Sequence, residues 1–379
     1  MTSELSSLCS YAKGKVSVDT LSKRNYVSTE NMMPNKGGIV DAGALPSAQY
    51  TQQYIKDDIL VSNIRPYFKK IWMADDDGGC SNDVLVFRAD RGCDSTFLYY
   101  ILANDAFFNY ASATSKGTKM PRGDKTAIMQ YKVPCFNYET QLRIGKLLRS
   151  IDDRIAVNKK INDNLQQQLF SLYENMATAS PCSKEYTLSN LCDFQEGYVN
   201  PPQTHPEYFD GELKWLRAVD INESFIIETS RTLTKAGFES AKKSALLFEP
   251  NTIAISKSGT IGRLGIIADY MCGNRAVINI APHDTNMLAF IYCFLKSKQR
   301  EFPDMAVGSV QKNLYVSLLE PLSVSIPDNE SLTAFNAVGA SILGMIHNNC
   351  VENTDLANLR DTILPKLMSG ELDVSSVLL

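Results

Sequence analysis

The sequence QLRIGKLLRSIDDRIAVNKKINDNLQQQLFSLYENM, residues 141–176, predicts one long helix that pairs with another helix. Its core positions recur at alternating steps of four and three residues, which is the heptad spacing of a coiled coil. Two positions in the middle, Asn158 and Asn162, are polar where a coiled coil usually has apolar residues. The full seam is Ile144, Leu148, Ile151, Ile155, Asn158, Asn162, Leu165, Leu169, Leu172 and Met176.

A second seam of the same kind lies near the end of the chain. Its positions are Phe335, Val338, Ile342, Met345, Asn349, Glu352, Leu356, Leu359, Ile363 and Leu367. If the helices run antiparallel with residue numbers that sum to about 511, Asn162 faces Asn349 and Asn158 faces Glu352 or Asn353. We therefore predict a polar layer of Asn158, Asn162, Asn349 and Glu352, which costs stability but fixes the register of the pair. The alternative is that the asparagines face solvent in an imperfect seam.

The same seams set the expected length of the helices. Each spans 33 residues, which corresponds to about 50 Å at about 1.5 Å per residue. Gly339 and Gly344 are expected to weaken the second helix locally. Pro365 is expected to kink or end it.

The rest of the chain repeats itself at an offset of 183 to 194 residues. LSSLC at residues 5–9 returns as LSNLC at residues 188–192, and Gly14 returns as Gly197. Further matches follow in the same order, namely Val61 and Ser62 with Ile255 and Ser256, Cys80 and Asn82 with Cys272 and Asn274, and Gly117 with Gly308. This shared order favours a duplicated architecture over chance. Strands are expected near 54–61, 84–88 and 132–136, then 251–256, 276–280 and 322–326, with apolar helices near 96–110 and 286–302.

Length and composition limit the class of protein. A chain of 379 residues is long enough for two or three folded units. Its longest apolar stretch, residues 287–295, is too short for a bilayer, which takes roughly 20 residues, and the start of the chain lacks a signal pattern. Nine cysteines without a CxxC pair argue against a disulfide framework and a zinc site. The sequence thus predicts a cytoplasmic protein with no membrane span and no metal.

No catalytic constellation is evident. The three histidines, His205, His283 and His347, lack partners at metal-ligand spacing, and residues 256–263 lack the residue order of a phosphate-binding loop. Residues 200–203, Asn-Pro-Pro-Gln, are similar to a tetrapeptide of amino-group DNA methyltransferases, but Gln203 stands where those enzymes stack an aromatic residue on a flipped base. A stand-alone adenine-N6 methyltransferase is therefore the weaker alternative. A scaffold whose repeated units bind only protein is another.

The net charge of −4 means that any contact with DNA must come from local basic loops. Residues 65–72 and 115–125 combine positive charge with aromatic residues or glycine, and residues 256–263 and 308–313 occupy matching places in the second half. Arg and Lys favour guanine edges and phosphates, whereas Gln and Asn can read adenine. The candidate DNA-binding residues are Arg65, Lys69, Lys70, Lys116, Lys119, Arg122, Lys125, Lys257, Ser258, Arg263, Ser309, Gln311, Lys312 and Asn313.

Nearly the whole chain resembles the specificity (S) subunit of type I restriction–modification systems. The resemblance is carried by residues 141–155 and 158–165 of the first long helix, ISKSGTIG at 255–262, the loop at 308–309 that leads to Pro327, and ILPKLMSGEL at 363–372. One departure is Thr140, which separates Glu139 from Gln141 where the family often has them adjacent.

The resemblance implies an α+β fold with two similar target-recognition domains, separated by two long antiparallel coiled-coil helices in a pseudo-twofold repeat. The expected divisions are 1–138 and 181–328 for recognition, 139–180 for the central helix, and 329–379 for the C-terminal helix and tail. Each domain would read one half of a bipartite, asymmetric duplex DNA target. The helices would set the spacer and dock two methyltransferase (M) subunits.

The resemblance also implies that the chain is not an enzyme and holds no cofactor. The methyl donor and ATP sites would lie on partner subunits, with restriction/translocase (R) subunits as optional further partners.

Overall fold

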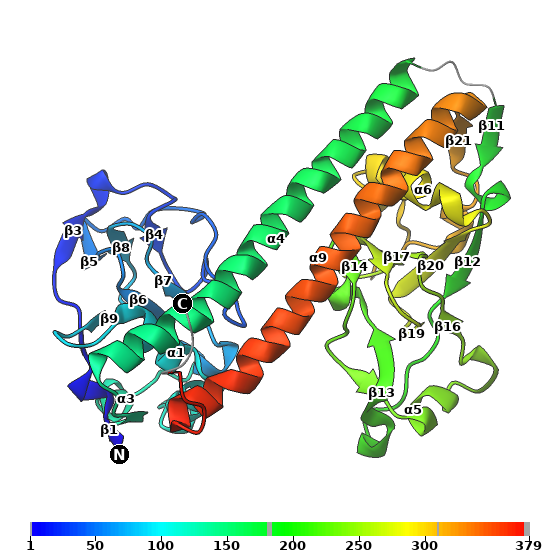
Figure 1. Cartoon of the computed structure of the whole chain (residues 1–379). Helices are drawn as coiled ribbons and strands as arrows, with labels where there is room; N and C mark the ends of the chain where they lie inside the picture. The colour runs from blue at the N-terminus through cyan, green and yellow to red at the C-terminus, as the bar shows by residue number, and fades with distance from the viewer. Residues whose placement is uncertain (1, 180–183, 309–310, 375–379) are drawn as a thin grey trace. The chain divides into compact units, whose positions relative to one another are not determined.

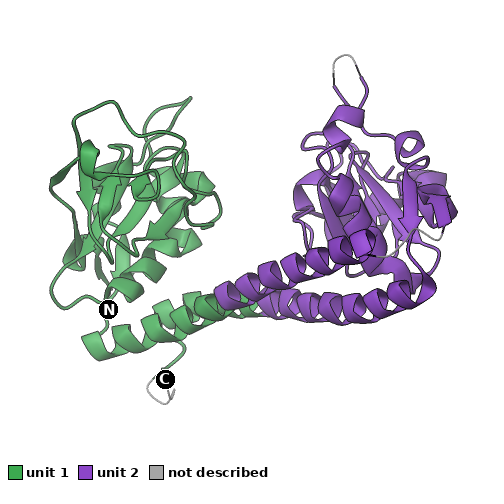
Figure 2. Ribbon diagram, turned by 90° about the horizontal axis from the view of Figure 1, so that it is seen from above, with its two compact units in different colours: residues 1–154, 356–379 green, residues 155–355 purple. Residues whose placement is uncertain are grey.

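The computed structural model describes residues 2–179, 184–308 and 311–374. The fold is α+β, and it divides into two compact units (Figure 2). Unit 1 comprises Met1–Arg154 and Leu356–Leu379, and unit 2 comprises Ile155–Asp355. Each unit therefore contains its own sheets and a segment of both long helices.

Unit 1 is built on two four-stranded sheets, of order β2-β9-β6-β7 and β3-β5-β8-β4, and a two-stranded sheet β1-β10 (Figure 1). The strands are β1 (Thr2–Glu4), β2 (Cys9–Tyr11), β3 (Lys15–Ser17), β4 (Tyr26–Val27), β5 (Tyr50–Tyr54), β6 (Ile59–Ser62), β7 (Ile71–Met73), β8 (Gly78–Cys80), β9 (Val84–Ala89) and β10 (Lys132–Pro134). The short helices are α1 (Ser95–Ala103), α2 (Asp105–Ala113) and α3 (Lys125–Met129).

Unit 2 has sheets of order β12-β20-β17-β18-β14, β15-β13-β19-β16 and β11-β21. The strands are β11 (Lys184–Thr187), β12 (Cys192–Glu196), β13 (Phe209–Leu216), β14 (Phe225–Ile226), β15 (Thr232–Leu233), β16 (Leu247–Phe248), β17 (Ile253–Ser256), β18 (Leu264–Ile267), β19 (Met271–Gly273), β20 (Val277–Pro282) and β21 (Ser323–Ile326). The short helices are α5 (Lys235–Glu239), α6 (Leu288–Lys298), α7 (Phe302–Met305) and α8 (Val316–Leu319).

The internal repeat predicted from the sequence is confirmed by the strand pairing. The first strand of each unit pairs antiparallel with its last, β1 with β10 and β11 with β21. A one-turn 3-10 helix then begins with a fully buried leucine, Leu5 or Leu188, and leads into β2 or β12. The central strand, β6 or β17, lies between equivalent neighbours in both units.

Two sequence matches, Cys80 with Cys272 and Asn82 with Asn274, are each wrong by a single residue. Val27 pairs with Cys80 in the parallel pair β4 and β8, whereas the equivalent Leu216 pairs with Gly273 in β13 and β19. Cys80 is therefore equivalent to Gly273, not to Cys272. The two cysteines therefore occupy neighbouring, not equivalent, positions of the repeat. The pairing of the backbone strands shows this, whereas the matching residue type does not.

Two of the expected elements are interrupted. The expected strand at 54–61 is two strands, β5 and β6, joined by a turn in which Asp57 has a left-handed φ of 68°. The expected helix at 96–110 is likewise two helices, because Asn104 caps the second by accepting a hydrogen bond from the Ala106 N–H. The stretch at 286–302 holds α6, followed by α7 from Phe302.

The two long helices, α4 (Tyr138–Ala179, 42 residues) and α9 (Asn329–Ser369, 41 residues), extend beyond the predicted seams. They run antiparallel within each unit (Figure 1), since Asp152 meets Arg360 in unit 1 and Asn162 meets Asn349 in unit 2. Of the two outcomes expected at Pro365, a kink or an end, the end is wrong, because Pro365 lies inside α9. Leu364 and Leu367 are buried in the core of unit 1 on either side of it, and this packing offsets the cost of about 3 kcal/mol for an internal proline.

The seam of α4 follows the prediction up to Leu169, after which Tyr173 is buried instead of Leu172. The seam of α9 differs more. Val338, Met345 and Leu359 are about half exposed, and the buried positions include Ile342 and Ile346. Ile342 and Ile346 are buried because this part of α9 packs on the core of unit 2 as well as on α4.

The close packing of α9 against α6 explains why residue 339 is a glycine. A Cβ atom on Gly339 would lie 2.6 Å from the Cβ of Ala289 in α6, whereas a Cβ on Gly344 would have no neighbour within 4 Å. Gly339→Ala is expected to lower the free energy of unfolding by about 1–2 kcal/mol, because overpacking outweighs the gain in helix propensity. Gly344→Ala should raise it by about 0.5–1 kcal/mol. Urea denaturation of the two matched variants checks this, and shifts of the same sign would contradict the packing argument.

Candidate nucleic-acid interface

The two basic stretches of unit 1 come together in the structure. The loop at 116–122 is closed by paired backbone hydrogen bonds between Lys116 and Arg122, at 2.8 and 2.9 Å. Gly117 inside it has a φ of 97°, which favours glycine. The loop is held to the segment after β6, because the Arg65 N–H donates to Pro121 O (2.8 Å) and the Arg65 guanidinium donates to Lys119 O (3.4 Å).

The cations of this surface differ in how firmly they are held. Lys116 pairs with Asp124 at 2.5 Å and Arg122 pairs with Asp83 at 2.9 Å, yet the two cationic side chains are 81% and 59% exposed. The hydrogen bond from Lys116 lowers the pKa of Asp124. Such exposed pairs contribute little to stability, so phosphate oxygens can replace the carboxylates. Lys119 and Lys125 are exposed as well.

Lys69 and Lys70 are more deeply placed. Lys69 Nζ lies 2.8 Å from an Asp105 oxygen, and Lys70 Nζ donates to Thr29 O at 2.6 Å. Burial lowers the pKa of Lys70. Burial by itself would raise the pKa of Asp105, but the hydrogen bonds from Lys69 and Lys36 lower it overall. These lysines tie the segment after β6 to Asp105 of α2 and to Thr29. The charge of Lys69 is therefore partly balanced by a carboxylate of its own unit.

Unit 2 builds the same loop with different side chains. Paired backbone hydrogen bonds between Val307 and Asn313, at 3.0 and 2.9 Å, close it across the same six-residue interval. The next residue, Leu314, donates to Lys257 O at 2.9 Å, as Gly123 donates to Asn63 O in unit 1. Gln311 and Lys312 are exposed on this loop, while Ser309 lies outside the described residues.

The second stretch of unit 2, residues 256–263, is held internally. Lys257 Nζ lies 2.9 Å from both carboxylate oxygens of Glu196 and 4.8 Å from the Tyr315 ring centroid, and its side chain is only 12% exposed. Ser258 and Arg263 are half-buried. Lys257 therefore supports the loop instead of presenting a free charge.

Sequence reasoning missed two arginines of unit 2 that lie over aromatic rings, Arg217 and Arg231. The Arg231 guanidinium lies 4.1 Å from the Phe209 ring centroid and donates to Gln203 Oε1 at 2.9 Å. Arg217 lies over Trp215, 5.7 Å from the ring centroid. Because Arg217 follows the strand that pairs with β19, it occupies the place of Ser28 in unit 1. The signal in the sequence was the Trp215–Arg217 alternation, which is weak by itself.

The polar seam residues lie together inside unit 2. Asn349 Nδ2 donates to Asn162 Oδ1 at 2.8 Å, and Asn158 Nδ2 donates to Glu352 (2.8 Å) and Asn353 (3.1 Å). Asn158 and Asn162 are 1% and 5% exposed, so they do not face solvent. Their pairing follows the residue sum expected for an antiparallel register.

Two segments of the chain, residues 1–167 and 183–354, match the family described as type I restriction modification DNA specificity domain. The chain belongs to this family. Among relatives, the type I restriction enzyme MjaIX specificity subunit of Methanocaldococcus jannaschii is 24% identical over 76% of this chain and 71% of its own length. The HindI specificity subunit of Haemophilus influenzae is 26% identical over 92% of this chain and 94% of its own.

The fold is also that of a specificity subunit. A crystal structure of the type I restriction–modification S subunit from M. genitalium superposes with a TM-score of 0.55 at 19% identity, covering 97% of this chain and 96% of that one. A specificity subunit supplies recognition to a restriction–modification complex and carries out no reaction of its own. Nothing in these likenesses supports the stand-alone methyltransferase alternative at residues 200–203.

Across residues 2–179, 184–308 and 311–374, no group of three or more His, Cys, Asp or Glu residues is placed to hold a metal ion. In the same ranges, no helix has the length and apolar character needed to span a bilayer.

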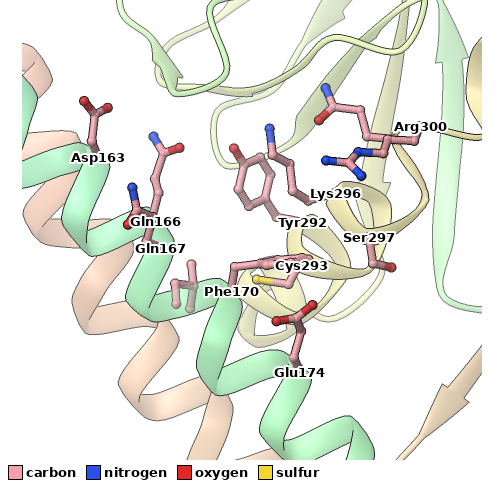
Figure 3. Close-up of a pocket in the computed structure, with 12 residues that line it drawn as sticks. Asp163, Gln166, Gln167, Phe170, Glu174, Tyr292, Cys293, Lys296, Ser297 and Arg300 are labelled. Carbon is pink, nitrogen blue, oxygen red and sulfur yellow. The ribbon is translucent and has the colours of Figure 1, made fainter.

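Unit 2 also has a cavity of about 730 Å³ between α4 and α6 (Figure 3). Its α4 side carries Asp163 and Glu174, and its α6 side carries Lys296 and Arg300. Glu223 holds Lys296 at 2.5 Å. The cavity is thus lined by carboxylates on one side and cations on the other, and Leu169 and Phe170 of α4 also line it.

Proposed function

We propose that this chain reads a bipartite, asymmetric duplex DNA target, with one half-site contacted by each unit. Residues 1–138 and 181–328 serve as the recognition domains, and residues 139–180 and 329–379 as the connecting helices and tail. The observation that carries this proposal is the pair of equivalent loops at 116–122 and 307–313. Both are closed by the same hydrogen bonds and differ in the side chains that they expose.

This arrangement suits sequence recognition because a constant backbone presents variable side chains. Unit 1 offers Lys119 and Arg122, which favour guanine edges and phosphates, whereas unit 2 offers Gln311 and Asn313, which suit adenine edges. Backbone contacts to phosphates set the position of a protein on the duplex, and side chains in the groove specify the sequence. Because the two loops differ, the two half-sites differ.

Membership of the family supports a proposal for the partners. Methyltransferase subunits, two per chain, dock on the helices and supply the methyl donor site, and restriction/translocase subunits join the same complex in the cytoplasm. The exposed apolar residues Val338 and Met345 of α9 are suited to such docking. The chain needs no cofactor for its part, because positioning DNA requires only contacts.

The test is genome-wide mapping of methylated bases in cells that carry the methyltransferase subunit with and without this chain. The expected result is a single bipartite motif that is methylated only when the chain is present. Titration of the isolated chain with the methyl donor provides the second arm. Binding of the donor by this chain alone, or a methylation motif that does not depend on the chain, would overturn the proposal.

Loop variants should separate the two half-sites. Gln311→Ala is expected to reduce discrimination by about 1–3 kcal/mol at one position of one half-site, which appears as a relaxed base in the methylated motif. Lys119→Ala should instead relax a base in the other half-site if Lys119 contacts a base. If Lys119 contacts a phosphate, the variant should weaken DNA binding and leave the methylated motif unchanged. A variant that relaxes both halves together would contradict the assignment of one loop to each half-site.

A further inference from the structure

A cleft of about 480 Å³ in unit 1 is lined by three lysines, Lys13, Lys15 and Lys125. The residues that line it, all within the described part of the chain, include no Asp or Glu. Tyr11 and the exposed Tyr50 form part of its wall. None of the loops discussed above includes Lys13 or Lys15, and both side chains are exposed.

The cleft is a built feature of the fold. Gly14, between β2 and β3, has a φ of 133°, a conformation that favours glycine, and its carbonyl accepts a hydrogen bond from Gln53 N–H at 3.2 Å. On the opposite side, the Tyr11 hydroxyl donates to Lys125 O at 3.0 Å, and Lys125 Nζ lies 5.9 Å from the Tyr11 ring centroid. The segments that carry the lysines are therefore fixed to one another.

Carboxylates next to the cleft are already engaged. Asp124 precedes Lys125 in the chain and pairs with Lys116, and Asp83 follows the lining residue Asn82 and pairs with Arg122. The positive charge of the cleft is therefore not cancelled by these neighbours. Both pairs also connect the cleft to the loop at 116–122, so one basic surface continues from the loop into the cleft.

Unit 2 has no cation at the three equivalent places. Strand register makes Glu196 equivalent to Lys13, because Phe194 pairs with Ile280 as Tyr11 pairs with Phe87. Two residues on, Tyr198 takes the place of Lys15. Val316 begins α8 as Lys125 begins α3. The single acid, Glu196, binds Lys257 instead.

We propose that the cleft of Lys13, Lys15 and Lys125 holds the phosphate backbone of duplex DNA beside the half-site read by unit 1, and that unit 2 has no such clamp. The ligand is a polyanion and not a small anion, because the lysines are exposed along an open surface that continues into a DNA-contacting loop. The clamp rests on the proposed function, since it requires that unit 1 bind DNA. It supplies affinity without sequence information.

The experiment measures affinity for a mixed-sequence duplex against salt concentration, using the complex of the full chain with its methyltransferase subunits. The magnitude of the slope of log K against log salt should fall by about 0.9 for each lysine removed in Lys13→Gln, Lys15→Gln and the double variant. Lys13→Arg with Lys15→Arg should keep the slope. Lys56→Gln, in the exposed turn between β5 and β6, is the matched control and should leave the slope unchanged.

The outcomes distinguish the clamp from the function on which it rests. A reduced slope with an unchanged methylated motif supports the clamp. An unchanged slope in the double variant, or an equal loss in Lys56→Gln, overturns the clamp while DNA binding stands. If the unmodified complex fails to bind duplex DNA at all, the proposed function fails with it.

Discussion

Replacing Asn162 with leucine alone is expected to lower the free energy of unfolding by about 1–3 kcal/mol, the cost of leaving a buried polar partner unsatisfied. Asn349 would lose the acceptor that it now reaches at 2.8 Å. The double variant Asn162→Leu with Asn349→Leu should recover this loss or exceed the stability of the unmodified chain, since paired polar groups in a seam cost stability. Urea denaturation of the two single variants and the double variant gives the coupling energy.

The double variant should also loosen the register of α4 against α9. Disulfide trapping tests this in a Cys350→Ser background. Cysteines at 165 and 346 report the observed register, and cysteines at 165 and 353 report a slip of one heptad. The slipped disulfide is expected only when both asparagines are leucine. If Asn162→Leu alone is as stable as the unmodified chain, the polar layer does not fix the pairing.

The register of α4 against α9 could be predicted from the sequence because each seam has polar residues at positions that are otherwise apolar. Asn158 and Asn162 break one seam and Asn349 and Glu352 break the other, so only one antiparallel alignment brings both pairs of breaks together. The exposed side of α9 could not be predicted in the same way. Val338 and Met345 fit the heptad as well as Ile342 does, and only the approach of Gly339 to Ala289 shows which face is covered.

The sequence predicted which loops form the candidate interface. It did not predict which of their cationic side chains are free to contact DNA. Lys257 belongs to a basic stretch in the sequence, yet it is held by Glu196, 61 residues away. Lys69 is held by Asp105. Local charge counts miss such pairs because the partners come from distant strands and helices. Lys13 and Lys15 were overlooked for the converse reason, since two lysines around a glycine are unremarkable until the fold adds Lys125.

Adding one heptad to both long helices is expected to lengthen the unread spacer of the DNA target while both half-sites stay the same. Duplication of residues 148–154 in α4 and 356–362 in α9 inserts at opposed positions of the antiparallel pair, so every seam contact keeps its partner. Seven residues add about 10.5 Å of helix, and a DNA turn of about 10 base pairs spans about 34 Å. The spacer should therefore grow by about one to three base pairs, the upper value following from the full rise.

The measurement is the methylated motif in cells that carry the lengthened chain, compared with the unmodified chain. The original target should go unmethylated, because neither unit alone holds enough contacts for specific binding. Duplicating a heptad in α4 only is the matched control. It shifts the unit 1 part of α4 by one heptad against α9, which separates Asp152 from Arg360, and it should cause loss of stable protein instead of a new motif. A changed half-site with an unchanged spacer would contradict the prediction. It would mean that the long helices influence the shape of the DNA-reading loops and do not set the distance between the two half-sites.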